Sequence, residues 1–512
     1  MARKIYAAPD AQTAPASANL LVAAAILGLF AVSAVLSAPA PGFDELAHIS
    51  YIAHIQSTGN LWPALESMRL LDPHTFQFTD QANYLNHPPI FYALLAALGP
   101  KLEGHPQAIL AYRLFDVWLT TMGLAALLGL GLVARFARRE FYAFAIPLVC
   151  IPILAPLAGT VNNDNLAFLG GAVATLGAWQ LAATDRNKWL TVALAGMVVA
   201  AWAKLTGLVL TAVMLGAVIV YLTWHKRLRW TRAALLVLAS LLAIAPYFVY
   251  FLLYGSPTPE TPAQIALVEA ARATGWSDSP RESFPAYLLY FVCTFIANWM
   301  PIGDRSIFPL FLLVIPAAAL IAALMGIVLS LRRLRHSRET TLDIVVVAGA
   351  TALAVTLALH IGYSYGYSRH FSTGWTANAY PRYYLPIAAI VPLAGLSFLA
   401  AIDDPRWRVT LRVFLVGGPM LFLVSARRSA SGSRRLKHKD GCTHQLQLAK
   451  MMGFAKGSTH PTRLNKVARQ LNERPRKTLK FEPQQRDLTP GLRRPVEPAA
   501  KTRRSLKDAF DR

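Results

Sequence analysis

The sequence is poor in charged residues and in cysteine, and each shortage excludes a class of protein. Only 15% of its 512 residues are charged and 55% are hydrophobic, which is too apolar for an ordinary soluble enzyme. Three cysteines (Cys150, Cys293 and Cys442) are too few and too scattered for a disulfide framework. The sequence also lacks a Walker-type or Rossmann-type glycine loop, so neither kind of nucleotide site is expected.

The sequence does contain many long apolar runs. Runs of about twenty residues recur from residue 18 to residue 425, and that length is needed to cross ~30 Å of hydrocarbon. We predict an all-α, polytopic transmembrane helical bundle of about ten or eleven spans. The expected spans are 18–38, 108–134, 141–159, 165–183, 189–204, 206–224, 233–254, 306–331, 342–366, 383–402 and 409–425. The first lacks a convincing cleavage site and is expected to be a retained span. Segment 88–99 is too short to cross, and 286–302 is expected to be a re-entrant or interfacial helix.

Basic connections predict the orientation, because Lys and Arg are retained on the cytoplasmic side during insertion. They are RFARRE (135–140), DRNK (185–188), HKRLRWTR (225–232), RRLRHSR (332–338) and RWRVTLR (406–412). With residues 1–17 in the cytoplasm, all five clusters fall on one side. The first outer loop (39–107), the segment 159–165, residues 255–305 and residues 367–384 then face outward. We therefore expect a multi-pass protein of the bacterial inner membrane with its active site on the periplasmic face.

The C-terminal segment differs in composition from everything before it. Residues 427–512 hold 23 of the 50 Lys and Arg but only 7 of the 27 Asp and Glu, so they contribute +16 of the net charge of +23. Residues 18–425 are predicted to form the membrane domain, and 426–512 a basic, disordered tail. The tail could bind anionic lipid or nucleic acid, or be a plain solvated tail or a frameshifted end. We expect no catalytic residue there.

The first outer loop begins with the segment PGFDELAHIS (41–50). On a helix through 43–56, Asp44 and His48 share one arc, apart from the apolar face, and Glu45 lies near the apolar edge. Such a helix is expected to lie in the membrane interface with its apolar side down and Asp44 and His48 facing a cavity. Alternatively, Asp44 and Glu45 merely occupy the first turn, where the helix dipole favours acids.

Other polar residues gather in the remaining outer segments, and each has a plain structural alternative. His87 precedes Pro88-Pro89, which could simply be a helix-start signal. Asp164 in GTVNNDN (159–165) could pair with a base, a metal or a sugar hydroxyl, or could cap a helix. Lys204 in AWAKLTGLVL needs an anion unless it snorkels. Arg113 and Asp116, spaced i, i+3, are expected to form a structural ion pair.

The last outer loop combines several such residues beside the start of a span. They are Arg369, His370, Arg382, Tyr383 and Tyr384. Arg382 at the boundary suits the phosphate of a lipid, because guanidinium binds phosphate oxygens bidentately. It could equally be an interfacial anchor. The joint pattern predicts a chemistry that uses an activated donor carried on a lipid.

These motifs, in this order, resemble membrane glycosyltransferases of the GT-C superfold, and most closely the bacterial branch related to protein O-mannosyltransferases and lipid A aminoarabinose transferases. The resemblance covers roughly residues 18–402 and rests on PGFDELAHISYIAHIQSTGNLWP, NHPPIFYAL, NNDNLAFLGG, AWAKLTGLVL and YPRYYLPIAAIVPLAGL. Asn86-His87 departs from the family, which typically has an acidic residue and a lysine before the two prolines.

The resemblance implies transfer of a sugar from a polyprenyl-phosphate donor to a periplasmic glycan, lipid or protein acceptor. Asp44 would be the general base, with Glu45 beside it as a second catalytic candidate. The implied donor-binding residues are His48, His87, Asp164, Lys204, Arg382 and Tyr383. A divalent cation, Mg²⁺ or Mn²⁺, could take part, although the sequence predicts no metal site. We expect membrane lipid as a partner and no nucleic acid. A flippase for a lipid-linked saccharide and a non-catalytic scaffold are the alternatives.

Overall fold

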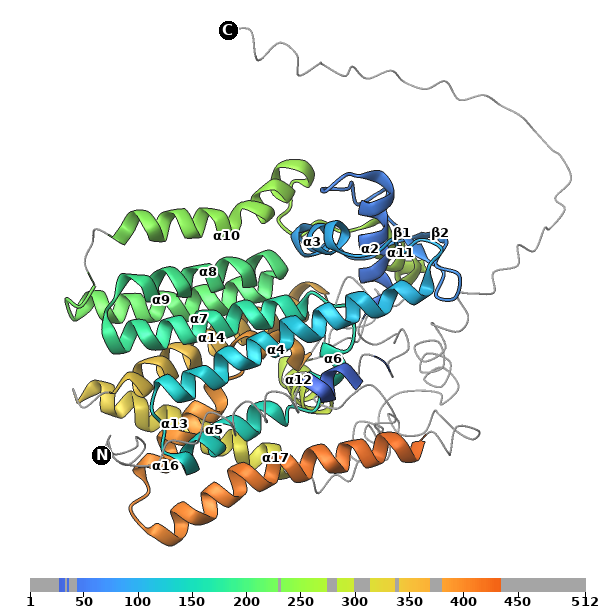
Figure 1. Ribbon diagram of the computed structural model, residues 1–512. Coiled ribbons are helices and arrows are strands. Elements are labelled where there is room, and N and C mark those ends of the chain that lie inside the picture. The colour runs from blue at the N-terminus through green and yellow to red at the C-terminus, as the bar shows by residue number, and fades with distance from the viewer. Residues whose placement is uncertain are drawn as a thin grey trace, which may run out of the picture. The chain divides into compact units, whose positions relative to one another are not determined.

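The computed structural model describes residues 27–32, 35, 44–228, 232–273, 283–298, 314–336, 340–368 and 380–433, and these are almost entirely helical (Figure 1). All of them belong to one compact unit, Met1–Lys439. Most of the expected first span and the basic tail from residue 434 onward lie outside the described residues, as do Arg369 and His370.

Six described helices are long and apolar enough to cross a membrane, which confirms the polytopic helical class. They are α4 (Ile109–Val133), α7 (Asp164–Thr184), α9 (Leu205–Trp224), α10 (Ala233–Tyr254), α13 (Val314–Arg335) and α14 (Thr341–Tyr363). A seventh forms if η8 (Pro381–Ile387) and α16 (Ile390–Ala401), which are bent by 64°, count as one span. The shorter helix α8 (Asn187–Ala203) is also apolar.

Two of the expected spans are broken into separate helices. Segment 141–159 divides into α5 (Arg138–Val149) and α6 (Leu154–Ala158). Pro152 falls at this break, where a missing backbone N–H removes a helical hydrogen bond. Segment 383–402 divides between η8 and α16, and Pro386 lies inside η8. Both breaks place irregular backbone inside the bundle.

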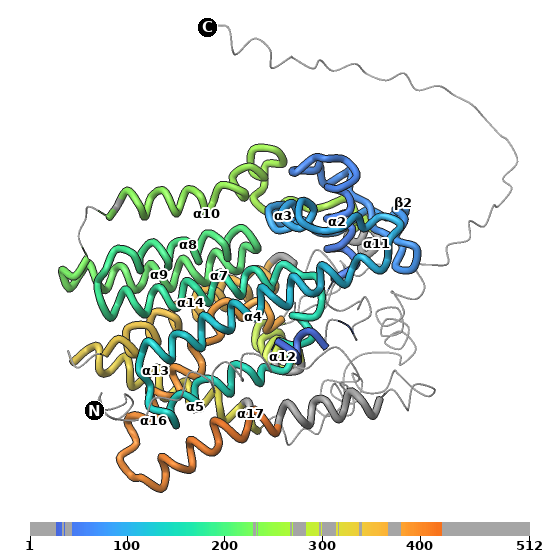
Figure 2. The backbone as a smooth tube through the Cα atoms, in the orientation of Figure 1, coloured from blue at the N-terminus to red at the C-terminus, as the bar shows by residue number. Residues whose placement is uncertain are grey.

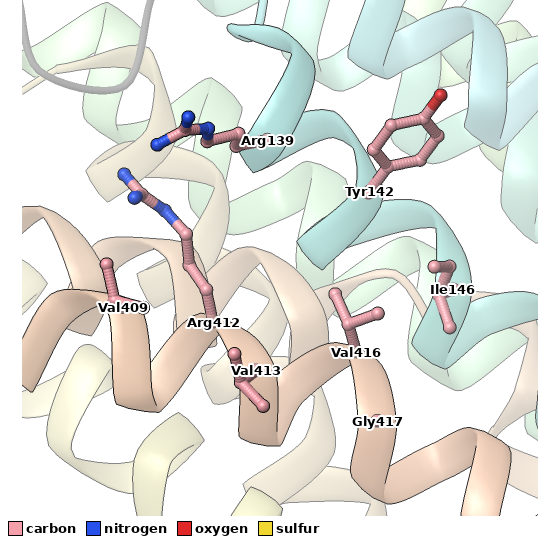
Figure 3. Close-up of a pocket in the computed structure, with 8 residues that line it drawn as sticks. All are labelled: Arg139, Tyr142, Ile146, Val409, Arg412, Val413, Val416 and Gly417. Carbon is pink, nitrogen blue, oxygen red and sulfur yellow. The ribbon is translucent and has the colours of Figure 1, made fainter.

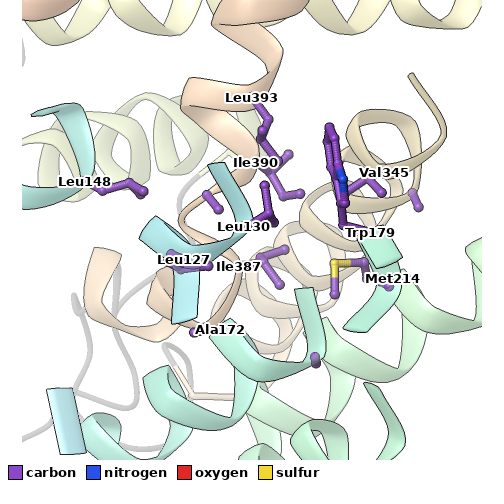
Figure 4. Packing of buried hydrophobic residues seen from close by; sticks show 14 of the residues in the cluster. Leu127, Leu130, Leu148, Ala172, Trp179, Met214, Val345, Ile387, Ile390 and Leu393 are labelled. Carbon is purple, nitrogen blue, oxygen red and sulfur yellow. The ribbon is translucent and has the colours of Figure 1, made fainter. Parts of the chain in front are cut away.

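Helix α7 is the centre of the packing. It contacts α4, α8, α9, α14 and η8, and the tube in Figure 2 shows α7, α8 and α9 running side by side. Gly170 and Gly196 allow α7 and α8 to approach each other closely, because a Cβ at either position would collide with the backbone of the facing helix. Leucine, valine and aromatic side chains fill the rest of this core, including Leu127, Trp179 and Leu393 (Figure 4).

The first outer loop forms a small packed layer with its own buried cluster. It contains α2 (Glu45–Thr58), the antiparallel strands β1 (Arg69–Leu71) and β2 (Phe78–Ala82), and α3 (Ile90–Leu98), followed by η2 (Pro106–Ala108). The hairpin was not predicted; it turns where the Asp72 carboxylate accepts hydrogen bonds from the N–H groups of His74 and Thr75. Helix α3 matches the short segment expected at 88–99.

Helix α2 corrects one prediction. It does not present a single apolar side to the membrane, because residues around most of its circumference, from Ala47 to Ile55, are buried against α3, β1 and neighbouring elements. Helices α11 (Pro262–Ala273) and α12 (Phe284–Ala297) lie within the segment 255–305, and the described part of α12 is a short apolar helix of 14 residues. Helix α17 (Pro405–Ser433) continues past residue 426, where the tail was predicted to begin.

Candidate functional site

Asp44 lies immediately before α2 with its backbone in the left-handed region, at φ 58°. Its side chain makes no capping hydrogen bond to the helix. Instead, Oδ1 accepts a hydrogen bond from the Tyr84 hydroxyl at 3.0 Å, and Oδ2 accepts one from Arg382 Nη2 at 3.0 Å. A left-handed aspartate costs about 1 kcal/mol. The carboxylate is therefore used in contacts with the rest of the molecule and not in helix capping.

Arg382 joins this first acid to a second one. Its Nε lies 3.4 Å from Oδ2 of Asp164, the first residue of α7. Asp164 does not cap its own helix; the backbone N–H of Asp164 donates to Oδ1 of Asn162 at 2.8 Å. Arg382 itself is only 6% exposed, so it is a buried bridge between two carboxylates and not an interfacial anchor.

Lys204 completes the row of charges. It occupies the one-residue gap between α8 and α9, and its Nζ donates to Asp164 Oδ1 at 2.8 Å. The same Nζ lies 3.9 Å from the centre of the Tyr383 ring, a cation–π contact. Lys204 therefore forms a buried ion pair and does not snorkel to the membrane surface. Asp44, Arg382, Asp164, Lys204 and Tyr383, which we call the charge row, come from four parts of the chain.

Exposure separates the acids of this region. The Asp44 side chain is 33% exposed, whereas that of Asp164 is 3% and that of Glu45 is 0%. The partners of Asp164 and Glu45 exclude solvent from these two carboxylates, whereas one side of the Asp44 carboxylate stays accessible. Each carboxylate oxygen has two lone pairs, so both Asp44 oxygens can still accept a further hydrogen bond.

His48 and His87 stack beside the charge row. Their ring centres are 6.2 Å apart, and His48 Nδ1 shares a hydrogen bond of 2.9 Å with the Tyr92 hydroxyl. Burial, followed by the nearby His87, lowers the pKa of His48 well below its usual value. Burial and the Lys204 ammonium lower the pKa of His87 to about 3. Both imidazoles are therefore neutral at pH 7. His48 is 2% exposed and its ring lies between those of His87 and Tyr92.

Glu45 has a different surrounding from its neighbour. Its carboxylate accepts hydrogen bonds from Nε and Nη2 of Arg113 at 2.8 and 2.7 Å, and from the backbone N–H of Val161 at 3.0 Å. The expected pairing of Arg113 with Asp116 is thus replaced by a bidentate pair with Glu45. Because Glu45 is fully buried, it ties α2 to α4 and to the segment before α7. We therefore propose that Glu45 positions these elements and that Asp44 is the candidate for the chemical step.

The charge row does not fit a divalent metal. Among the residues that the structure describes, no group of three or more His, Cys, Asp or Glu side chains is arranged to hold one. The carboxylates of Asp44 and Asp164 are both paired with Arg382, and Asp164 also accepts from Lys204. Cations of the chain occupy the positions that a metal ion would need.

Two further residues of the site were not singled out from the sequence. Tyr84 donates to Asp44, and burial together with that carboxylate raises the pKa of Tyr84, so its hydroxyl stays protonated. Tyr92 bonds His48 and stacks on Tyr51 at 4.1 Å between ring centres. Both lie in the YLNHPPIFYAL segment (84–94), and its two tyrosines were the feature of the sequence that could have identified them.

Comparison with known proteins gives one distant likeness. No family model matches the sequence, and no curated protein matches it significantly. The crystal structure of ArnT from Cupriavidus metallidurans bound to undecaprenyl phosphate is similar over 92% of this chain and 82% of that chain, with 15% identity and a TM-score of 0.43. The apo structure of the same protein is similar over 82% of this chain and 77% of that chain, with 14% identity and a TM-score of 0.45.

Proposed function

We propose that this protein is an integral membrane glycosyltransferase that moves a sugar from a polyprenyl-phosphate donor to an extracytoplasmic acceptor. The observation that carries the proposal is the contrast in exposure within the charge row: Asp44 is accessible, and the acid and the two cations behind it are buried. This arrangement offers one carboxylate to a substrate and holds it in place with fixed charges.

Asp44 serves as the general base in this proposal. As the acceptor oxygen forms the new bond to the anomeric carbon, its proton passes to an Asp44 oxygen. The bond between the anomeric carbon and the lipid phosphate oxygen breaks in the same step, and the phosphate leaves with the bonding electrons. A single displacement of this kind inverts the anomeric configuration. One carboxylate suffices, because phosphate leaves more readily than an alcohol.

Arg382 and Lys204 are proposed to stabilise the negative charge that develops on the leaving phosphate. Arg382 touches Asp44 directly, so a phosphate near Asp44 lies within reach of the same guanidinium. Tyr383 and Asp164 hold the Lys204 ammonium in place. His48 and His87, being neutral, are proposed to contact the donor through hydrogen bonds and not through charge.

A transfer assay tests this function. Membranes that contain the protein are supplied with radiolabelled polyprenyl-phosphate sugars, and label in lipid-free or acceptor-bound product is counted. We expect transfer with the wild type and its loss with Asp44→Asn. Asp80→Asn is the matched control, because Asp80 is an exposed acid on β2 in the same loop. Movement of intact donor across the membrane without transfer would favour a flippase instead.

A further inference from the structure

A second candidate site, mostly apolar and open to the surface, lies far from the charge row, between α5 and α17. A cavity of about 570 Å³ is formed there by residues of these two helices only (Figure 3). It adjoins the end of α4 opposite to Arg113. Because α4 has 25 residues, the two ends are separated by ~37 Å. The cavity is thus separate from the proposed catalytic region.

The two ends of this cavity differ in chemistry. Figure 3 shows the guanidinium groups of Arg139 and Arg412 at one end. Arg138 adds a third positive charge 6.0 Å from the centre of the Tyr142 ring, and Tyr142 lines the cavity. Among the described residues, the acid paired with Arg412 is Glu140, whose carboxylate accepts a hydrogen bond from it. The arginines near this end, Arg138, Arg139 and Arg412, outnumber Glu140, so the described residues give it a net positive charge.

The remainder of the cavity wall is apolar. Ile146, Val409, Val413, Val416 and Gly417 line it, and Val413 is 65% exposed. Valines exposed along a helix of a membrane protein are stable when they contact hydrocarbon chains. A phosphate at the arginines and an acyl chain along the valines would satisfy both ends at once.

We propose that this cavity binds an anionic phospholipid, with the phosphate held by Arg139 and Arg412 and an acyl chain lying along α17. A zwitterionic lipid is a poorer match, because its own positive group would approach the arginines. The basic connections RFARRE (135–140) and RWRVTLR (406–412) supply these arginines, so their charge contributes to a specific lipid contact as well as to orientation. The bound lipid would link the start of α17 to α5.

Native mass spectrometry of the full-length, delipidated protein tests this site. The protein is titrated with phosphatidylglycerol and with phosphatidylcholine of the same acyl chains. We expect the wild type to bind the anionic lipid about five-fold more tightly, because both lipids carry a phosphate but only phosphatidylcholine brings a positive choline toward the arginines. Arg139→Gln should remove most of this preference. Arg406→Gln is the control, because Arg406 is an exposed arginine of α17 that does not line the cavity.

A second variant tests the apolar part without changing charge. A Cβ at Gly417 meets no atom within 4 Å, so Gly417→Leu should fold and fill the cavity. We expect it to weaken phosphatidylglycerol binding, while Gly216→Leu, at a similarly open position on α9, should not.

Equal binding of the two lipids by the wild type would overturn the proposal, as would equal losses in Arg139→Gln and Arg406→Gln. A polyprenyl phosphate that binds here more tightly than phosphatidylglycerol would also overturn it.

Discussion

At the scale of single residues, each charged side chain of the charge row is stabilised by an oppositely charged neighbour. Asp164 is buried and is tolerated as an anion because Lys204 and Arg382 both approach it. Arg382 in turn is fixed by Asp44 at 3.0 Å. Removing one member of a buried pair leaves the other charge unpaired, which costs more than the pair itself contributes.

Lys204→Met should therefore destabilise the protein strongly. We expect a loss on the order of 3–5 kcal/mol, because the Asp164 carboxylate loses its closest cation. Thermal unfolding of purified protein in detergent measures the effect. The double variant Lys204→Met/Asp164→Asn should unfold at a higher temperature than Lys204→Met alone. If the double variant were less stable than either single change, the two side chains would not be coupled as described.

Glu45→Gln should distinguish a positioning residue from a base. The change removes the charge opposite Arg113 in a buried bidentate pair, so the unfolding temperature should fall. Transfer by the folded fraction should keep the wild-type dependence on pH, because Glu45 does not reach a substrate. A change in the pH profile of Glu45→Gln would return this residue to the catalytic group.

The depressed pKa of His87 predicts an acid sensitivity. Between pH 6.5 and about 3 the unfolded chain binds a proton at His87 and the folded chain does not, so stability falls as pH is lowered. The slope approaches about 1.4 kcal/mol per pH unit from this group. Unfolding temperatures measured from pH 7 to pH 4 should fall less steeply for His87→Gln. Equal slopes for the wild type and the variant would contradict a neutral imidazole in the folded protein.

At the scale of elements, η8 is held in place by α7. A Cβ at Gly171 of α7 would collide with the backbone of Pro386, and Pro386 lies four residues after Arg382 in η8. Only glycine permits this approach. The position of Arg382 therefore depends on a residue with no polar group of its own.

Gly171→Leu should abolish transfer by displacing η8. We expect at least a ~100-fold loss, the scale of effect seen when a charged group in an active site is misplaced. Gly129→Leu on α4 is the matched control, because a Cβ there meets no atom within 4 Å. The measurement is the transfer rate per folded molecule. Wild-type transfer in Gly171→Leu would show that η8 need not touch α7.

The sequence predicted elements better than their interactions. Apolar runs located the long helices α4, α7, α8, α9, α10, α13 and α14, since burial in lipid requires length and low polarity. The broken spans and the β1–β2 hairpin were missed, because a proline in an apolar run and a short turn leave the composition almost unchanged. The ion-pair partner of Arg113 was also predicted wrongly. Sequence spacing suggested Asp116, whereas tertiary packing brings Glu45 to Arg113.

At the scale of the whole molecule, the candidate site depends on segments far apart in the sequence. Asp44 and Arg382 are separated by 338 positions and meet only in the folded chain. The order of the motifs suggested that these residues act together, but no periodicity places one beside the other. The sequence could therefore name the members of the charge row without giving their contacts.

The predicted orientation can be tested with single cysteines. After the three native cysteines are replaced by serine, Asp80→Cys on the outer loop and Arg186→Cys between α7 and α8 offer two exposed positions. Asp80→Cys should react with a membrane-impermeant maleimide in intact cells, because basic connections such as 185–188 remain inside. Arg186→Cys should react only after the membrane is opened. The reverse pattern would place the charge row on the cytoplasmic side.

The central claim is that Asp44 acts in the chemical step while the buried charges behind it bind and position. Single-turnover transfer by Asp44→Asn, measured together with equilibrium binding of the polyprenyl-phosphate donor, tests this most directly. We predict a transfer rate lower by ~100-fold or more, as expected for loss of a general base, with donor binding changed by less than about three-fold. A transfer rate equal to that of the wild type would contradict the claim.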